Sequence, residues 1–359
     1  MSAYSRFFSD RHASLEAYTP GEQPRDMAYI KLNTNESPYP PSPGVAAAVA
    51  REAGRLQLYS DPTCRDLNAK AAHVLGVGED QILMTNGSDE ILNFIFMAFG
   101  DSRHPFAFPT LTYGFYPVFA RLNNIPYREI PMGADLSIDP ADYRGLGMHI
   151  VIANPNAPTG LYLDVSQIEQ IVATNRDSVV VVDEAYIDFG GESCLPLLKA
   201  YDNLLITRTF SKSYSLAGAR LGFGIGHPSL IADLNTVKYS TNPYNINRMT
   251  MAAGIAALEE NDYYREKCRL VAGERERTKA ALRGLGFTVT DSAANFLFAA
   301  HPELDGEELY LALRRRGILV RHFSTPAIRN YNRITVGTAT QMDALLDAVK
   351  DYMKEVSVL

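Results

Sequence analysis

The sequence predicts an α/β protein: a large domain with a mostly parallel sheet flanked by helices, then a smaller α+β domain. Short apolar runs alternate with helix-like stretches through the middle of the chain. Two of these runs, His149–Ala153 (HIVIA) and Ser178–Val182 (SVVVV), are apolar almost throughout, which is typical of parallel strands buried on both faces. Shorter helices and strands follow from about residue 274, which indicates the second, smaller unit.

Taken in order, residues 1–44 are expected to form an extended arm that joins the small domain, because the prolines of Ser37–Pro43 cannot occupy a helix interior. Residues 45–245 would form the large domain and residues 246–359 the small C-terminal domain. The strands expected in the large domain are 81–85, 106–108, 149–153, 178–182, 203–208 and 222–226, with helices at 88–99 and from about Asp164. The small domain is expected to contain strands at 295–298, 318–321 and 333–336 and helices at 274–283, 305–316 and 340–355.

Composition excludes several classes of function. The net charge of −7 and the pI of about 5.6 give no electrostatic basis for binding nucleic acid or an anionic membrane. The apolar runs are too short to cross a bilayer, and Met1–Arg11 lacks the pattern of a secretory signal. The three scattered cysteines form no CxxC pair and the histidines no HExxH motif, so neither a disulfide framework nor a metal site is predicted. We therefore expect a cytoplasmic enzyme.

Polar residues follow each predicted strand, at the edge where open α/β sheets bind ligands. Asn86–Glu90 comes after the first strand, where Gly87 permits a tight turn and Ser88 or Asp89 can begin a helix. The free N–H groups of such a helix N-terminus suit a phosphate, although this motif taken alone favours a plain helix cap without a ligand.

Two ionisable residues stand at later strand ends. Asp183 ends the four-valine strand, where its carboxylate would keep a pyridine nitrogen protonated, or would simply face water. Lys212 follows strand 203–208; a desolvated amine there can attack an aldehyde, whereas most lysines are solvated surface groups. Ser211 and Arg220 are near enough in sequence to bind a phosphate of the same cofactor.

The motifs NGSDE, NPNAPTG, VVDEAY and RTFSKSYSLAGARLG, in this order, resemble those of the fold-type-I, class-II aminotransferases, and among them the histidinol-phosphate aminotransferases. Further matches reach from Leu32–Pro38 to Arg333–Gly337. The resemblance implies pyridoxal 5'-phosphate as cofactor, joined covalently to the amine of Lys212. Its ring nitrogen would face Asp183, its phenolic oxygen Tyr186 and its ring face Tyr113. The phosphate-binding residues that the resemblance implies are Ser88, Asp89, Ser211 and Arg220, with Tyr59 contributed by the neighbouring subunit of a homodimer.

The resemblance also implies a substrate pocket. Arg333 matches the arginine that binds the anionic end of the substrate, and the other candidates are Arg321, Tyr18, Asn35 and Tyr244. The sequence departs from the family pattern at Ala157, where an asparagine usually bonds the cofactor's phenolic oxygen. We hypothesise that Asn156 or Tyr186 covers that role.

The implied activity is transfer of an amino group from L-histidinol phosphate to 2-oxoglutarate, a step of histidine biosynthesis, with ping-pong kinetics. An aromatic amino acid aminotransferase and a threonine-phosphate decarboxylase use the same cofactor and remain alternatives. A nicotinamide- or nucleotide-binding enzyme is disfavoured because neither GxGxxG nor GxxxxGK[ST] occurs. A regulatory protein without turnover is disfavoured because no basic DNA-binding segment is visible.

Overall fold

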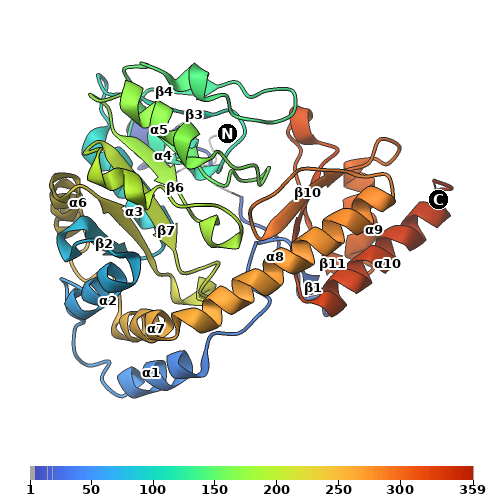
Figure 1. Cartoon of the computed structure of the whole chain (residues 1–359), viewed down its shortest axis with the longest axis horizontal. Coiled ribbons are helices and arrows are strands. Elements are labelled where there is room, and N and C mark those ends of the chain that lie inside the picture. The colour runs from blue at the N-terminus through green and yellow to red at the C-terminus, as the bar shows by residue number, and fades with distance from the viewer. Residues whose placement is uncertain (1–4, 14, 18, 359) are drawn as a thin grey trace.

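A seven-stranded sheet is the centre of the large domain in the computed structural model, which describes residues 5–13, 15–17 and 19–358 (Figure 1). Its strands are β2 (Ile82–Thr85), β3 (Phe106–Pro109), β4 (Tyr127–Ile130), β5 (His149–Ala153), β6 (Val180–Asp183), β7 (Leu204–Thr209) and β8 (Gly222–Gly226). The strand order is β2-β8-β7-β6-β5-β3-β4; β8 is antiparallel to both of its neighbours, and the other neighbouring strands are parallel. The predicted α/β fold class is confirmed.

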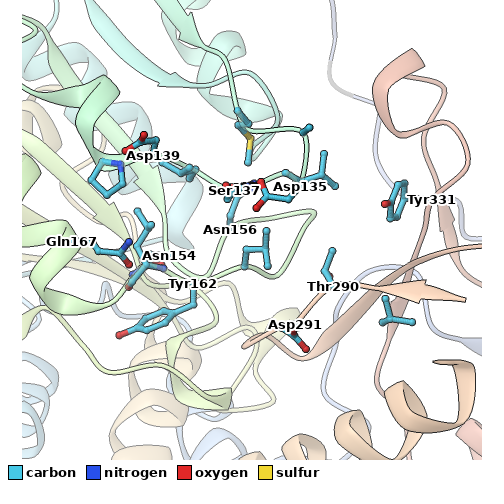
Figure 2. Close-up of a pocket in the computed structure, with 18 of the residues that line it drawn as sticks. Asp135, Ser137, Asp139, Asn154, Asn156, Tyr162, Gln167, Thr290, Asp291 and Tyr331 are labelled. Atoms are coloured by element: carbon cyan, nitrogen blue, oxygen red, sulfur yellow. Dashed lines mark hydrogen bonds between the residues drawn. The ribbon is translucent and has the colours of Figure 1, made fainter. Parts of the chain in front are cut away.

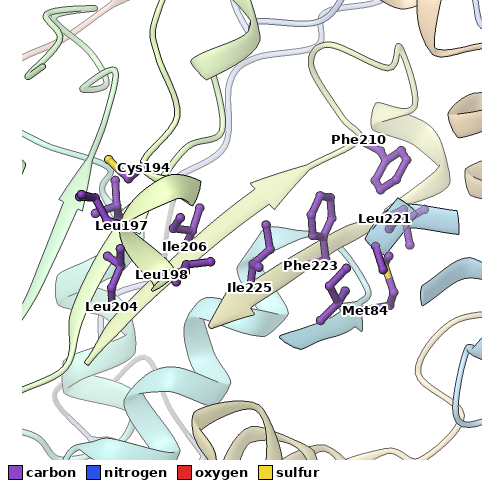
Figure 3. Close-up of a cluster of buried hydrophobic side chains, with 14 of the residues drawn as sticks. Met84, Cys194, Leu197, Leu198, Leu204, Ile206, Phe210, Leu221, Phe223 and Ile225 are labelled. Carbon is purple, nitrogen blue, oxygen red and sulfur yellow. The ribbon is translucent and has the colours of Figure 1, made fainter. Parts of the chain in front are cut away.

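Helices cover both faces of this sheet. The first layer contains α3 (Ser88–Phe99), α4 (Phe115–Leu122) and α6 (Pro228–Thr241). The second contains α1 (Pro43–Ala53), α2 (Arg65–Leu75), α5 (Val165–Thr174) and α7 (Arg248–Glu259). Alternate side chains of each strand enter the two layers, so Val181 contacts the first and Val180 the second. Figure 3 shows part of the second layer, where Ile206, Phe223 and Ile225 from β7 and β8 pack together.

The small domain contains two sheets. β9 (Thr288–Val289), β10 (Phe296–Ala300), β12 (Arg321–His322) and β13 (Asn332–Thr335) form an antiparallel sheet in the order β12-β13-β10-β9. β1 (Ile30–Lys31) of the arm pairs in parallel with β11 (Ile318–Leu319). The single strand expected at 318–321 is thus two short strands in different sheets, with Val320 between them. Helices α9 (Gly306–Arg315) and α10 (Ala339–Glu355) complete this core.

Helix α8 (Asn261–Gly284) runs from one domain to the other (Figure 1). Tyr264 near its start belongs to the large-domain core, and Leu282 near its end to the small-domain core. Gly273 lies near its midpoint, where a Cβ atom would meet no other atom within 4 Å. Helix α7 packs on α1 and α2 of the large domain. The boundary between residues 245 and 246 stays a prediction.

Several elements were not anticipated, namely α1, α2, α4, α6 and α7. The 3₁₀ turns are η1 (Asp10–His12), η2 (Glu79–Gln81), η3 (Pro140–Tyr143), η4 (Ile187–Phe189), η5 (Leu195–Lys199), η6 (Ala217–Ala219) and η7 (Pro326–Ile328). Among the described residues, no helix is both long and apolar enough to span a membrane, and no three His, Cys, Asp or Glu side chains gather as metal ligands.

Candidate active site

A cavity of about 280 Å³ lies where strands β5, β6 and β7 end. Most of the residues predicted from the strand ends meet there, together with residues of the arm. The lining residues are Thr34, Glu36, Ser88, Asp89, Tyr113, Ala153, Ala157, Asp183, Ala185, Tyr186, Thr209, Ser211, Lys212, Ala217 and Arg220. The lining therefore combines an amine, three carboxyl groups, a guanidinium and two phenols.

Asp183 is the most deeply buried acid of the cavity, with 4% of its surface exposed. Burial raises the pKa of its carboxyl to about 6, although two hydroxyl groups oppose that rise. The Tyr116 hydroxyl donates to Oδ2 at 2.9 Å and the Thr207 hydroxyl to Oδ1 at 3.0 Å. These bonds fix the carboxylate and favour its charged form, which suits a cationic partner in the cavity.

Lys212 lines the cavity and is therefore partly accessible, but protein atoms crowd its amine. Burial, and after it the positive charge of Arg333, lower the pKa of the amine to about 8. Its Nζ donates to the Thr34 carbonyl at 3.2 Å, so the arm forms part of this wall. At neutral pH an appreciable share of such amines is neutral and nucleophilic.

The N-terminus of α3 forms one end of the cavity. Gly87 has a φ of +79°, and a Cβ atom there would meet Nη2 of Arg220 at 2.6 Å. A Cβ atom at Gly222 would overlap the backbone of Gly87 and Ser88, so β8 can lie this close to the turn only because residue 222 is glycine. Arg220 donates to Asp89 Oδ2 at 3.0 Å. The helix N-terminus and a guanidinium thus lie together, an arrangement suited to phosphate.

The phenol groups of the cavity are held by hydrogen bonds. Asn35 donates to the Tyr186 hydroxyl at 3.0 Å, and Thr335 donates to Asn35 Oδ1 at 3.0 Å. Tyr113 donates to Asp89 Oδ1 at 2.7 Å. Asn35, on the arm, therefore connects the small-domain strand β13 to the floor of the cavity.

Arg333 and Arg321 are cross-strand partners in the small-domain sheet. Both guanidinium groups lie 5.8 Å from the centre of the Phe323 ring. Arg333 donates to the Asn33 carbonyl at 3.0 Å, and Arg321 makes longer bonds to the arm carbonyls of Thr19 and Pro20. Like charges directly opposite each other repel, so the pair favours an anion between them.

Six predicted site residues that the structure describes are not part of the cavity lining, namely Asn35, Asn156, Tyr59, Tyr244, Arg321 and Arg333. Asn156 is 1% exposed and its amide bonds Leu111, Thr112 and Thr159, whereas its neighbour Ala157 faces the cavity. Tyr59 is 80% exposed and stacks on Tyr244 at 4.6 Å. The remaining predicted residue, Tyr18, lies outside the described residues.

A second cavity is larger, with a volume of about 760 Å³ (Figure 2). It lies between the large-domain loop that carries Asp135 and Ser137 and the small-domain residues Thr290, Asp291 and Tyr331. Asn156 lines this cavity, but no Lys, Arg or His does among the described residues. It therefore offers no cation for a phosphate and no amine for covalent chemistry.

Sequence reasoning missed Tyr116 and Thr207, which hold Asp183, and Thr34 and Glu36 of the arm. Thr207 could have been found, because it is the register partner of Asp183 on the neighbouring strand. Tyr116 lies within α4, and no sequence pattern connected that helix to a carboxylate on β6.

Comparison with known proteins agrees with this geometry. Residues 28–349 match the family described as Aminotransferase class I and II. The chain is similar to the histidinol-phosphate aminotransferase of Brachyspira hyodysenteriae, with 49% identity over 350 residues that cover 97% of this chain and 99% of that protein. It is 44% identical over 348 residues to the enzyme of the same name from Clostridium acetobutylicum, covering 97% of this chain and 99% of that protein.

Among solved structures, the crystal structure of histidinol-phosphate aminotransferase from Sinorhizobium meliloti in complex with pyridoxal-5'-phosphate superimposes with a TM-score of 0.87. That match covers 99% of both chains at 24% identity, so it bears on the fold alone. The family match spans nearly the whole chain and includes the cavity residues from Thr34 to Arg220. The resemblance stated from the motifs is confirmed: the chain belongs to the class I and II aminotransferase family.

Proposed function

We propose that this protein is a pyridoxal-phosphate-dependent aminotransferase that exchanges an amino group between L-histidinol phosphate and 2-oxoglutarate, in histidine biosynthesis. The observation that carries the proposal is one cavity lined by a low-pKa amine, Lys212, a buried carboxylate, Asp183, and a helix N-terminus beside Arg220. The names of relatives with 44–49% identity support the substrate.

The residues present fit the cofactor. Ser88, Asp89, Ser211 and Arg220 would bind its phosphate, at the helix N-terminus that Gly87 and Gly222 leave open. Asp183 would face the ring nitrogen; its buried carboxylate makes no ion pair with a described residue, and a protonated ring nitrogen would supply the cationic partner. Tyr113 would cover the ring. Tyr186 would bond the phenolic oxygen without help from Asn156, whose amide is engaged elsewhere.

When bound, the cofactor supplies an aldehyde for covalent capture of the amine and a ring that withdraws electrons. Lys212 would attach through its amine and, once displaced by substrate, carry the proton to and from the substrate carbon. Its pKa of about 8 suits both tasks at neutral pH. Asp183 would stay charged against the protonated ring nitrogen.

Arg333 and Arg321 would bind the phosphate of one substrate and the carboxylate of the other in turn, because a planar guanidinium pairs with either anion in two-point fashion. Asn35 would complete the pocket wall beside Tyr186. Tyr244 and Tyr18 are retained as candidates, Tyr244 at the exposed stack with Tyr59.

A cytoplasmic homodimer is part of the proposal. Tyr59 is too exposed to serve its own cavity, which supports a role at the phosphate of a second subunit. The large apolar side chains of Leu56, Leu58 and Tyr239 are also exposed. Exposed apolar side chains that gather in one patch are typical of a protein–protein interface. The three buried cysteines are unpaired, as is usual in a reducing compartment.

The test is an absorption titration. The purified protein with cofactor should absorb visible light, and L-histidinol phosphate should abolish that band without release of carbon dioxide. Addition of 2-oxoglutarate should restore it. Phenylalanine should act far more weakly; equal turnover would indicate the aromatic aminotransferase, and carbon dioxide from threonine phosphate would indicate the lyase. A protein that takes up no cofactor would refute the proposal.

A further inference from the structure

The backbone that carries Tyr59 is held firmly although the Tyr59 ring is exposed. Arg248 donates from Nη1 to the Tyr59 carbonyl at 2.9 Å, and Ser60 donates to the Ile246 carbonyl at 2.6 Å. The buried Lys238 donates to the Pro62 carbonyl at 2.5 Å. The Tyr59 ring stacks on Tyr244 yet stays 80% exposed, and an exposed aromatic ring on a tethered loop suits contact with another chain.

Arg248 is the residue that connects this loop to the helical scaffold. Its Nε donates to Glu52 Oε2 on α1 at 2.8 Å, while Nη1 bonds the Tyr59 carbonyl. The side chain is 18% exposed, so both bonds are partly shielded from water. Because Arg248 begins α7 and Glu52 ends α1, the two most closely packed helices of the domain hold the guanidinium in place.

The segment just before Arg248 is tied to the phosphate end of the chain's own cavity. Asn245 donates to Glu90 Oε2 at 2.6 Å, and the same oxygen accepts the Asn86 amide at 2.6 Å. The Asn86 side chain returns a bond to the Asn245 carbonyl at 3.0 Å. Residues 245–248 therefore link the first turn of α3, which lines the cavity, to the loop that presents Tyr59.

We propose that Arg248 is a positioning residue for the cofactor site of the partner subunit: it fixes Tyr59 so that its hydroxyl meets the phosphate held by a second copy of this chain. The inference rests on the proposed function. It adds a residue that touches neither cofactor nor substrate but determines how well the opposite subunit binds the cofactor.

The experiment uses hybrid dimers in which only one subunit retains Lys212. In the first hybrid, Arg248→Met is placed in the subunit with Lys212; in the second, it is placed in the subunit carrying Lys212→Ala. The working site receives Tyr59 of the partner subunit, so the second hybrid should bind pyridoxal phosphate about tenfold more weakly, as for the loss of one charge-assisted hydrogen bond. The first hybrid should match a hybrid with both arginines intact. The readout is the dissociation constant at the working site, from absorption of the lysine-bound cofactor.

Tyr59→Phe, placed in the same subunit of each hybrid dimer as Arg248→Met, should weaken cofactor binding in the second hybrid and leave it unchanged in the first. Arg316→Met is the matched control, because Arg316 makes a comparable ion pair with Glu355 in the small domain; it should alter neither hybrid. If Arg248→Met weakens the site of its own subunit, or both sites equally, the positioning role is refuted. If Arg248→Met does not form dimers, Arg248→Lys, which cannot reach both acceptors, takes its place in both hybrids. Failure of unmodified dimers to bind the cofactor would instead refute the proposed function.

Discussion

Removing the Tyr116 hydroxyl should make the stability of the apoprotein depend more strongly on pH. In the unmodified chain, burial raises the pKa of Asp183 from 3.8 to about 6. The folded state therefore holds a proton that the unfolded state releases, and stability falls as pH rises from about 4 to about 6. A shift of about two pH units corresponds to roughly 3 kcal/mol, which is an order-of-magnitude figure for this buried group.

Tyr116→Phe deletes the 2.9 Å bond to Oδ2 of Asp183. A hydrogen bond to a charged acceptor contributes about 2.5 kcal/mol and one to a neutral acceptor about 1 kcal/mol. The variant should therefore be less stable than the unmodified chain by about 1 kcal/mol at pH 5 and by about 2.5 kcal/mol at pH 8.5. Because this difference raises the folded-state pKa of Asp183 by about one unit, the fall of stability with rising pH should continue to a pH about one unit higher.

Urea unfolding of the apoprotein at both pH values measures the effect. Tyr143→Phe is the matched control: Tyr143 is 1% exposed, and its hydroxyl has no hydrogen-bond partner among the described residues. Its effect should not change with pH. If the deficit of Tyr116→Phe is the same at pH 5 and pH 8.5, the hydroxyl does not stabilise the charged carboxylate and the reasoning fails.

Three further predictions follow from the site. Arg333→Met removes a positive charge that lowers the pKa of the Lys212 amine, so that pKa should rise in the apoprotein; the pH dependence of the reaction of Lys212 with an amine-selective reagent measures it, and a midpoint that moved down would contradict this. Glu184→Gln breaks a buried ion pair with Arg208 at 2.9 Å and should cost about 3–5 kcal/mol, seen as a large drop in Tm; a drop of a degree or less would count against it. Asn156→Ala should lower stability by about 1–3 kcal/mol yet leave the cofactor's absorption unchanged, and a shifted band would return Asn156 to the site.

The central strands were predictable because burial on both faces leaves a continuous apolar run. His149–Ala153 coincides with β5, and helix 88–99 coincides with α3, whose start is marked by Gly87. Helices α1 and α7 were not predictable, because their alanine-rich faces give weak periodicity and tertiary packing stabilises them.

The site was predictable where a residue lies at the end of a strand or just after it, as Asp183 and Lys212 do. It was not predictable where a loop decides direction. Ala157 rather than Asn156 faces the cavity because the Asn156 amide bonds the backbone of Leu111 and the side chains of Thr112 and Thr159. Strand alternation does not apply to such a loop.

The unbroken helix α8 connects the two cores, so a change in its direction moves the small domain relative to the large domain. Tyr264 and Leu282 are separated by 18 residues, or about 27 Å at 1.5 Å per residue, so a tilt of about 5° at one end displaces the other by roughly 2 Å. That displacement would carry β13 and Arg333 toward or away from Lys212. Gly273 stands near the centre of α8 with empty space beside it, where alanine would stiffen the helix by about 0.5–1 kcal/mol. A bend at this point would change the distance between the two domains while both hydrophobic cores stay intact.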